Sequence, residues 1–87
     1  MPEPLVYVLV INWNGREHLA DCFDSLLSGT YRNCRFLLVD NHSADGSIAF
    51  VRERYRDPRI EILALPDNLG WSEGNNRGIE QALDAGA

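Results

Sequence analysis

The sequence predicts an α/β fold in which three parallel strands alternate with three helices, in the order β-α-β-α-β-α. Short, mostly apolar runs occur at residues 5–11, 35–40 and 59–65. Each run leads through a short polar loop into a segment with the apolar spacing of a helix. Helices that connect parallel strands cover the faces of the sheet, so we expect a three-layer arrangement around a three-stranded parallel sheet. A length of 87 residues allows one domain.

The first unit is predicted from an unbroken apolar run and the helical pattern that follows it. Residues 5–11 are β-branched or apolar throughout, which is typical of a strand buried on both faces. Asn14 followed by Glu17 indicates a helix N-cap with a capping box. Gly29 is expected to end that helix. The apolar face of the helix comprises Leu19, Cys22, Phe23, Leu26 and Leu27.

The second and third units are shorter. Residues 35–40 form a strand that ends in Asp40, and the following helix should bury Ile48, Val51 and Tyr55. Pro58 ends this helix. After the strand at residues 59–65, a third helix is expected with Ser72 as its cap. Its sheet-facing residues are predicted to be Trp71, Ile79, Ala82 and Leu83.

The composition excludes several classes of protein. The net charge is −5 and all eight basic residues are arginines without a basic patch, which argues against nucleic acid as a partner. The longest apolar run is far too short to span a bilayer. Cys22 and Cys34 have no metal-ligand spacing, so we expect reduced thiols in a cytoplasmic protein.

The first strand poses a structural problem. In a doubly wound sheet the first strand pairs with a strand that comes later in the sequence, and no later strand follows here. Residues 5–11 would therefore form an open edge, which invites pairing with another chain. We expect either a homodimer through this edge or a chain that is part of something larger.

Polar side chains gather where the predicted strands end. Open α/β sheets bind their ligands at this carboxyl edge. An amide-rich rim with few charges suits hydrogen bonding to a base, a ribose or a sugar and offers little for acid–base catalysis. The rim comprises Asn12, Asn14, Asp40, Asn41, Ser43, Asp45, Asp67, Asn68, Asn75 and Asn76.

Individual rim residues allow more than one interpretation. Asp40 could accept a hydrogen bond from a ligand or cap its own loop, and the spacing favours neither. Asp45 is expected to stabilise the start of the second helix. Trp13 could stack on a base or serve packing. His42 could line the site, although no function is the simpler interpretation.

Several motifs are missing. No glycine-rich dinucleotide fingerprint and no P-loop occur. No acidic pair at i, i+2 follows a strand, where a divalent metal with a diphosphate would need it.

Four segments together resemble the amino-terminal portion of family 2 glycosyltransferases, particularly the bacterial rhamnosyltransferase-like group. These are residues 8–14, 38–47, 68–70 and 74–78. The resemblance covers residues 5–87 and implies a GT-A fold, whose Rossmann-like nucleotide-binding half precedes an acceptor-binding half. It also implies sugar transfer from a UDP-, GDP- or dTDP-linked donor to a saccharide or lipid-linked acceptor, with Mn²⁺ or Mg²⁺, in polysaccharide biosynthesis.

The resemblance implies specific roles for the rim. Asp40 would hydrogen-bond the base or ribose, and Asn12 and Trp13 would flank the nucleotide. Many family members have arginine where Asn75 stands, so the phosphate contact of that arginine is not carried over to Asn75. The other residues expected at the nucleotide are Asn14, Asn41, Asn68, Asn75 and Asn76.

The family's Asp-x-Asp metal motif and its catalytic base would lie beyond Ala87. We therefore expect residues 1–87 to be the nucleotide-sugar-binding part of a truncated GT-A domain, with no catalytic residue, no metal ligand and no transfer activity alone. The full-length enzyme would be cytoplasmic or at the cytoplasmic face of the membrane. The alternative is a non-enzymatic module that binds a nucleotide or self-associates. A flavodoxin-like regulatory domain is disfavoured because it needs five strands and an acidic residue where Asn12 stands.

Overall fold

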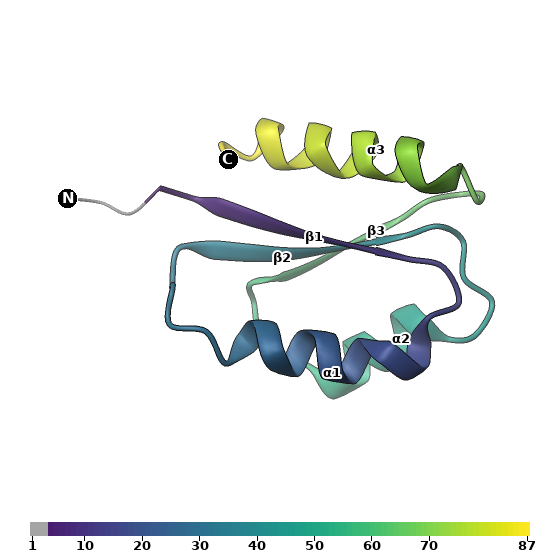
Figure 1. Cartoon of the computed structure of the whole chain (residues 1–87), viewed down its shortest axis with the longest axis horizontal. Coiled ribbons are helices and arrows are strands. Elements are labelled where there is room, and N and C mark those ends of the chain that lie inside the picture. The colour runs from purple at the N-terminus through teal and green to yellow at the C-terminus, as the bar shows by residue number, and fades with distance from the viewer. Residues whose placement is uncertain (1–3) are drawn as a thin grey trace.

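The computed structural model describes residues 4–87, and its helices and strands alternate as the sequence predicts (Figure 1). The strands are β1 (Val6–Asn12), β2 (Cys34–Asp40) and β3 (Ile60–Ala64). The helices are α1 (Arg16–Leu27), α2 (Ser47–Arg54) and α3 (Gly70–Asp84). The predicted α/β class is confirmed, with strand boundaries shifted by about one residue.

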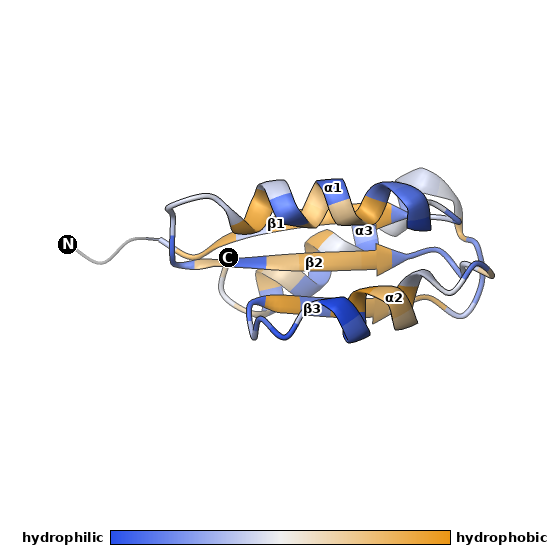
Figure 2. Cartoon of the chain, turned by 90° about the horizontal axis from the view of Figure 1, so that it is seen from below, coloured by the Kyte–Doolittle hydropathy of each residue, from blue (hydrophilic) through white to orange (hydrophobic). Residues whose placement is uncertain are grey.

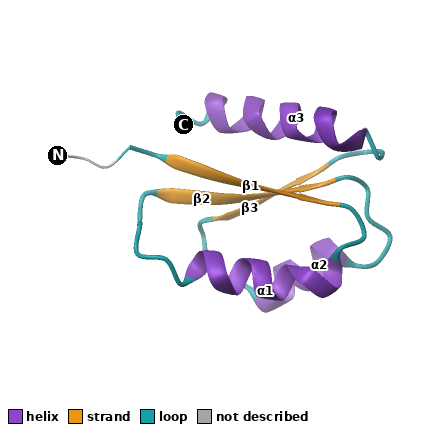
Figure 3. Ribbon diagram, in the orientation of Figure 1, coloured by secondary structure: helices purple, strands orange, loops and turns teal. Residues whose placement is uncertain are grey.

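The three strands are parallel, and β2 lies between β1 and β3. Asn12 pairs with Asp40, and Asp40 pairs with Ala64, so the three strands end together at one edge. Helices α1 and α2 cover one face of the sheet and α3 covers the other (Figures 1 and 3). The expected three-layer arrangement is present, and it brings the loops after the strands to one end of the molecule.

The core is centred on β2, which Figure 2 shows as a mainly hydrophobic strand between β1 and β3. Leu37, Leu38 and Val39 are fully buried. Phe23 of α1 and Val51 of α2 join the core on one face of the sheet. Because β2 contacts helices on both faces, it is apolar at successive positions rather than at alternate ones.

Helix α3 packs on the sheet through small residues, contrary to the sequence prediction. Trp71, Ile79 and Leu83 are exposed. The buried positions are Gly74, Gly78 and Ala82, of which only Ala82 was predicted.

The backbone of α3 lies close to the sheet, which explains why small residues occupy the buried face of this helix. A Cβ atom at Gly78 would lie 2.9 Å from Cγ2 of Val39 and 3.2 Å from a methyl carbon of Leu9. The small residues of α3 therefore occupy the contact with the sheet, and its large apolar side chains are left exposed.

Two predicted helix caps are wrong. Helix α1 begins after Gly15, without a side-chain cap. Asn14 lies before that position with φ = 52°, and its side chain binds the neighbouring loop. Ser72 lies inside α3, whose N-cap is Leu69. The predicted end of α1 is confirmed, because Gly29 directly follows the C-cap Ser28, at the position where glycine commonly ends a helix.

Strand β1 is an edge of the described sheet, as expected, and its Val6 is 41% exposed. Both cysteines are free thiols. None of the helices found among residues 4–87 has the length and apolar character needed to cross a membrane.

Candidate functional site

The loops at the carboxyl edge are joined by main-chain hydrogen bonds that continue the sheet. The Asn41 N–H donates to the Asn12 carbonyl at 2.8 Å, and the Leu65 N–H donates to the Asp40 carbonyl at 2.9 Å. The polar residues that follow the three strands are therefore neighbours, as the sequence predicts. Their side chains fall into a buried group that connects the loops and an exposed group that faces solvent.

Asp40 is at the centre of the buried group and is only 1% exposed. Its Oδ1 accepts hydrogen bonds from Nδ2 of Asn12 at 2.9 Å and from Oγ of Ser43 at 2.7 Å. Its Oδ2 accepts one from the Ser43 N–H at 2.8 Å. A carboxylate can accept about four hydrogen bonds. One acceptor position therefore remains, on Oδ2. The three existing hydrogen bonds show that Asp40 caps its own loop, independently of any ligand.

The Ser43 hydroxyl ties the first loop to the second. It donates to Asp40 and accepts from the Asn14 N–H at 2.8 Å and from Nδ2 of Asn12 at 3.2 Å. One donor and two acceptor positions are the full capacity of a hydroxyl. The sequence pattern places Ser43 on the rim but does not indicate this role. Its position three residues after Asp40, typical of a polar turn, is the only signal that could have done so.

Asn41 ties the second loop to the third. Its Oδ1 accepts from the Leu69 N–H at 3.2 Å, and its Nδ2 donates to the Gly70 carbonyl at 3.2 Å. A Cβ at Gly74 would lie 2.9 Å from Nδ2, so a larger residue there would have to displace this amide. Asn41 is 3% exposed. Its amide therefore positions the start of α3 and does not face solvent.

Asp45 stabilises the starts of two helices, which extends the sequence prediction. Its Oδ1 accepts from the hydroxyl and the N–H of Ser47 at the start of α2. Its Oδ2 accepts from the Arg16 N–H at the start of α1, at 3.0 Å. The Ser47 hydroxyl, followed by these main-chain donors, holds the pKa of Asp45 below its ordinary value. The carboxylate complements the partial positive charge of both helix starts.

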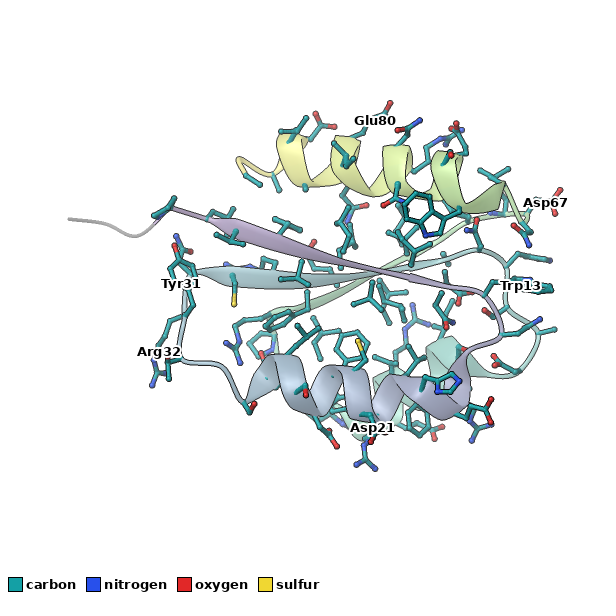
Figure 4. The ribbon with its side chains drawn as sticks, in the orientation of Figure 1. Trp13, Asp21, Tyr31, Arg32, Asp67 and Glu80 are labelled. Atoms are coloured by element: carbon teal, nitrogen blue, oxygen red, sulfur yellow. The ribbon has the colours of Figure 1, made fainter. Side chains whose placement is uncertain are left out.

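The exposed group lies around this framework. Trp13 is 59% exposed, and Asn14, Asn68 and Asn76 are exposed. Asn75 is half-buried and donates from Nδ2 to the Trp71 carbonyl at 3.0 Å. Figure 4 shows Trp13 at the same end of the molecule as Asp67, opposite Tyr31 and Arg32. More than half of the surface of Trp13 is therefore accessible at this end of the molecule.

A cavity of about 610 Å³ adjoins the first two loops on the side of α1 and α2. Arg16 and Arg54 lie over the Phe50 ring within it, at 5.4 and 6.0 Å from the ring centroid. Among the predicted ligand residues, the cavity lining includes only Asn14. The cavity therefore lies behind the carboxyl edge and is separate from Asp40.

The described residues do not fit a divalent metal on their own. Residues 4–87 contain no group of three or more histidine, cysteine, aspartate or glutamate side chains that could hold one. The buried carboxylate at the edge, Asp40, already accepts three hydrogen bonds within the protein.

Comparison with known sequences points to one family. The model of the family described as "Glycosyl transferase family 2" matches residues 7–84. A Bacillus subtilis protein named as a teichuronic acid biosynthesis glycosyltransferase is 28% identical over 81 residues, which cover 92% of this chain and 32% of that protein. The N-acetylglucosaminyl-diphospho-decaprenol L-rhamnosyltransferase of Mycobacterium tuberculosis is 35% identical over 83 residues, which cover 91% of this chain and 26% of that protein.

Comparison with solved structures supports the fold. A mannosyltransferase from Pyrobaculum calidifontis, solved in complex with GDP-Man and Mn²⁺, superposes with a TM-score of 0.83 at 21% identity. The match covers 92% of this chain and 25% of that chain. The chain therefore has the fold of part of a GT-A domain. It spans between about a quarter and a third of the length of the relatives it matches.

Proposed function

Because the chain belongs to glycosyl transferase family 2, we propose that residues 1–87 are the nucleotide-sugar-binding part of a sugar transferase. The whole protein would transfer a sugar from a nucleotide diphosphate donor to a saccharide or lipid-linked acceptor. The observation that carries the proposal is the buried Asp40 carboxylate at the carboxyl edge, with one acceptor position left open. Open α/β sheets bind ligands at this edge.

In this proposal Asp40 accepts a hydrogen bond from the base or the ribose. Its three other hydrogen bonds orient the carboxylate, and because Asp40 is only 1% exposed, a ligand reaches the open acceptor position only after local movement of the loops. Trp13, with 59% of its surface exposed, supplies an aromatic face on which a base can stack. Asn75 and Asn76, in the first half of α3, belong near the ribose and diphosphate.

Asn12 and Asn41 have a different role in the proposal. Both were expected among the ligand contacts, but each uses both its oxygen and its Nδ2 in hydrogen bonds to the loops. They orient the first and third loops around Asp40. The ligand-facing set is then Trp13, Asn14, Asp40, Asn68, Asn75 and Asn76.

We assign no catalytic residue to this chain. Inverting transfer needs a base that deprotonates the acceptor hydroxyl, and the rim offers amides and structural carboxylates. A divalent cation, Mn²⁺ or Mg²⁺, belongs to the proposal for the whole protein, since the mannosyltransferase neighbour contains Mn²⁺. Its ligands would come from outside residues 4–87. A cytoplasmic location, in solution or at the membrane face, is likewise proposed for the whole protein.

Self-association is the second candidate function, favoured by one observation. Strand β1 pairs with β2 on one side only, and its seven residues carry no charge that would discourage pairing on the other. A homodimer through this edge would join two sheets. Sedimentation of the dilute chain as a monomer would remove this candidate without affecting nucleotide binding.

Titration of the chain with UDP, GDP and dTDP tests the proposed function. We expect at least one nucleotide to shift NMR signals of the three loops after the strands, with the largest changes around Asp40 and Trp13. Signals at the opposite end of the sheet, such as Arg32, serve as the internal control. Absence of any change with all three nucleotides would overturn the proposal.

A further inference from the structure

The orientation of two exposed asparagine amides at the carboxyl edge is determined by main-chain donors. Oδ1 of Asn14 accepts from the Ala44 N–H at 2.7 Å. Oδ1 of Asn68 accepts from the Gly70 N–H at 2.9 Å. Only the oxygen of a side-chain amide accepts such a hydrogen bond. The oxygen therefore faces the main-chain donor, and Nδ2 lies on the other side of the amide. Each exposed Nδ2 therefore carries N–H donors that have no partner among residues 4–87.

Asn12, Asn41 and Asn75 differ, whereas no hydrogen bond among residues 4–87 fixes the exposed amide of Asn76. Nδ2 of Asn12 donates to Asp40 and Ser43, and Nδ2 of Asn41 donates to Gly70. Asn75 donates from its Nδ2 to a carbonyl of its own helix, and its oxygen has no partner among residues 4–87. Thus only some rim amides present donors, and local hydrogen bonds decide which ones.

The carboxyl edge offers few charged hydrogen-bond donors to an anionic or oxygen-rich ligand. The ligand-facing set contains no lysine or arginine. Arg16, next to the first loop, donates from Nη1 to the Asp45 carbonyl and lies over Phe50, on the cavity side. Phosphate and hydroxyl oxygens accept hydrogen bonds from neutral N–H groups, whereas a base N–H does not.

We infer that Asn14 and Asn68 bind oxygen atoms of the ligand as neutral N–H donors. The shared chemistry is an oxygen acceptor, supplied by the diphosphate, by a ribose hydroxyl or by a carbonyl of the base. This inference rests on the proposed function, because it describes how the same site holds its nucleotide. Asp40 and Asn75 contribute acceptors, so the rim presents both kinds of group in fixed positions.

One substitution at Asn14 removes the exposed N–H donors and keeps the acceptor for the Ala44 N–H. Asn14→Asp keeps an oxygen for the Ala44 N–H and replaces Nδ2 with a second oxygen. Asn14 has φ = 52°, which asparagine, aspartate and glycine tolerate better than other residues. Asn14→Gly therefore removes the donor without adding a charge. Asn68→Asp is the equivalent change in the third loop, where the Gly70 N–H keeps its acceptor.

The test compares these variants with Ser72→Asp, which adds a charge in the first turn of α3 at an exposed residue outside the ligand-facing set. We expect Asn14→Asp and Asn68→Asp to melt like the wild type. We expect them to bind the preferred nucleotide diphosphate about 10-fold more weakly or worse, as for loss of one hydrogen bond to a charged group. Asn14→Gly should also bind more weakly, and Ser72→Asp should change affinity less than about 3-fold.

Two further ligands identify the oxygen atoms. If the contacts are to phosphate, the variants lose affinity for the nucleotide diphosphate and for pyrophosphate but not for the nucleoside. If they are to the ribose or to a base carbonyl, binding of the nucleoside weakens as well. Wild-type affinity in Asn14→Gly and Asn68→Asp would overturn this inference and leave the proposed function intact. Failure of the wild type to bind any of UDP, GDP and dTDP would overturn both.

Discussion

Replacing Asp40 with asparagine should destabilise the fold even without a ligand. The carboxylate is 1% exposed and meets only donors: Nδ2 of Asn12, and the hydroxyl and N–H of Ser43. In Asp40→Asn the amide oxygen fits best at the Oδ1 position, where two donors converge. The new NH₂ group then faces the Ser43 N–H, which was 2.8 Å from Oδ2.

The size of the effect follows from these contacts. One main-chain donor loses its acceptor inside the protein, at a cost of about 1–3 kcal/mol. The two remaining bonds change from charge-assisted to neutral and lose about half their strength. Together we expect a loss of about 2–4 kcal/mol in the free energy of unfolding. For a chain of 60–100 residues this corresponds to a fall in Tm of roughly 8 °C or more.

Urea and thermal unfolding followed by circular dichroism measure this loss. Asp84→Asn is the matched control, because Asp84 is exposed at the end of α3, where a negative charge opposes the helix dipole. We expect the control to be neutral or slightly stabilising. If Asp40→Asn unfolds within about 0.5 kcal/mol of the wild type, the network around Asp40 does not hold the loops together.

Three further predictions follow from the packing, the charges and the edge strand. Gly78→Val should lower the free energy of unfolding by about 1–3 kcal/mol, because even a Cβ would lie 2.9 Å from Val39; in urea titrations, unchanged stability would show that α3 can move away from the sheet. The lowered pKa of Asp45 means that its ionised form stabilises the fold above the unfolded pKa, about 3.9, and that this contribution is lost as the pH falls through the folded value. Stability of the wild type should therefore decline below about pH 5 more steeply than that of Asp45→Asn, and parallel pH profiles would contradict the assignment. Val6→Lys, at the exposed start of β1, should reduce self-association in analytical ultracentrifugation, whereas an unchanged association constant would exclude this edge as the interface.

Apolar patterns that extend over whole strands and helices made most of the fold predictable. The apolar run that became β2 has side chains buried on both faces, and the helical spacing of Leu19 and Phe23 places them in the core as expected. These features depend on periodicity, which acts over a whole element. The convergence of the loops followed from parallel topology alone, since parallel strands end at the same edge.

Contacts between segments that are distant in the sequence explain the wrong predictions of helix caps and of the buried face of α3. Asn14 has the sequence signature of a cap, but its oxygen binds Ala44 in another loop, and Asp45 reaches the start of α1 from 29 residues away. The face of α3 was misassigned because large apolar residues were expected to be buried. Gly78 allows the helix backbone to approach the sheet and Gly74 allows it to approach the Asn41 amide, and hydropathy does not encode these distances.

The hydrogen-bonding roles of the rim could be anticipated only in part. The sequence left Asp40 open between capping a loop and meeting a ligand. The structure shows that Asp40 caps its loop. Ligand binding through the remaining acceptor position on Oδ2 stays a proposal. Asn12 and Asn41 looked equivalent to Asn14 and Asn68 in the sequence, because which amides are buried depends on contacts between loops that are distant in the chain.

The most direct test of the account is an NMR titration of the chain with UDP, GDP and dTDP that follows the loops after β1, β2 and β3. The account predicts that at least one nucleotide shifts the signals of Asp40, Trp13 and the side-chain amide of Asn14, while Arg32 at the far end of the sheet is unchanged. Signals that stay in place with every nucleotide, in a chain shown to be folded, would contradict the claim that this edge binds the donor.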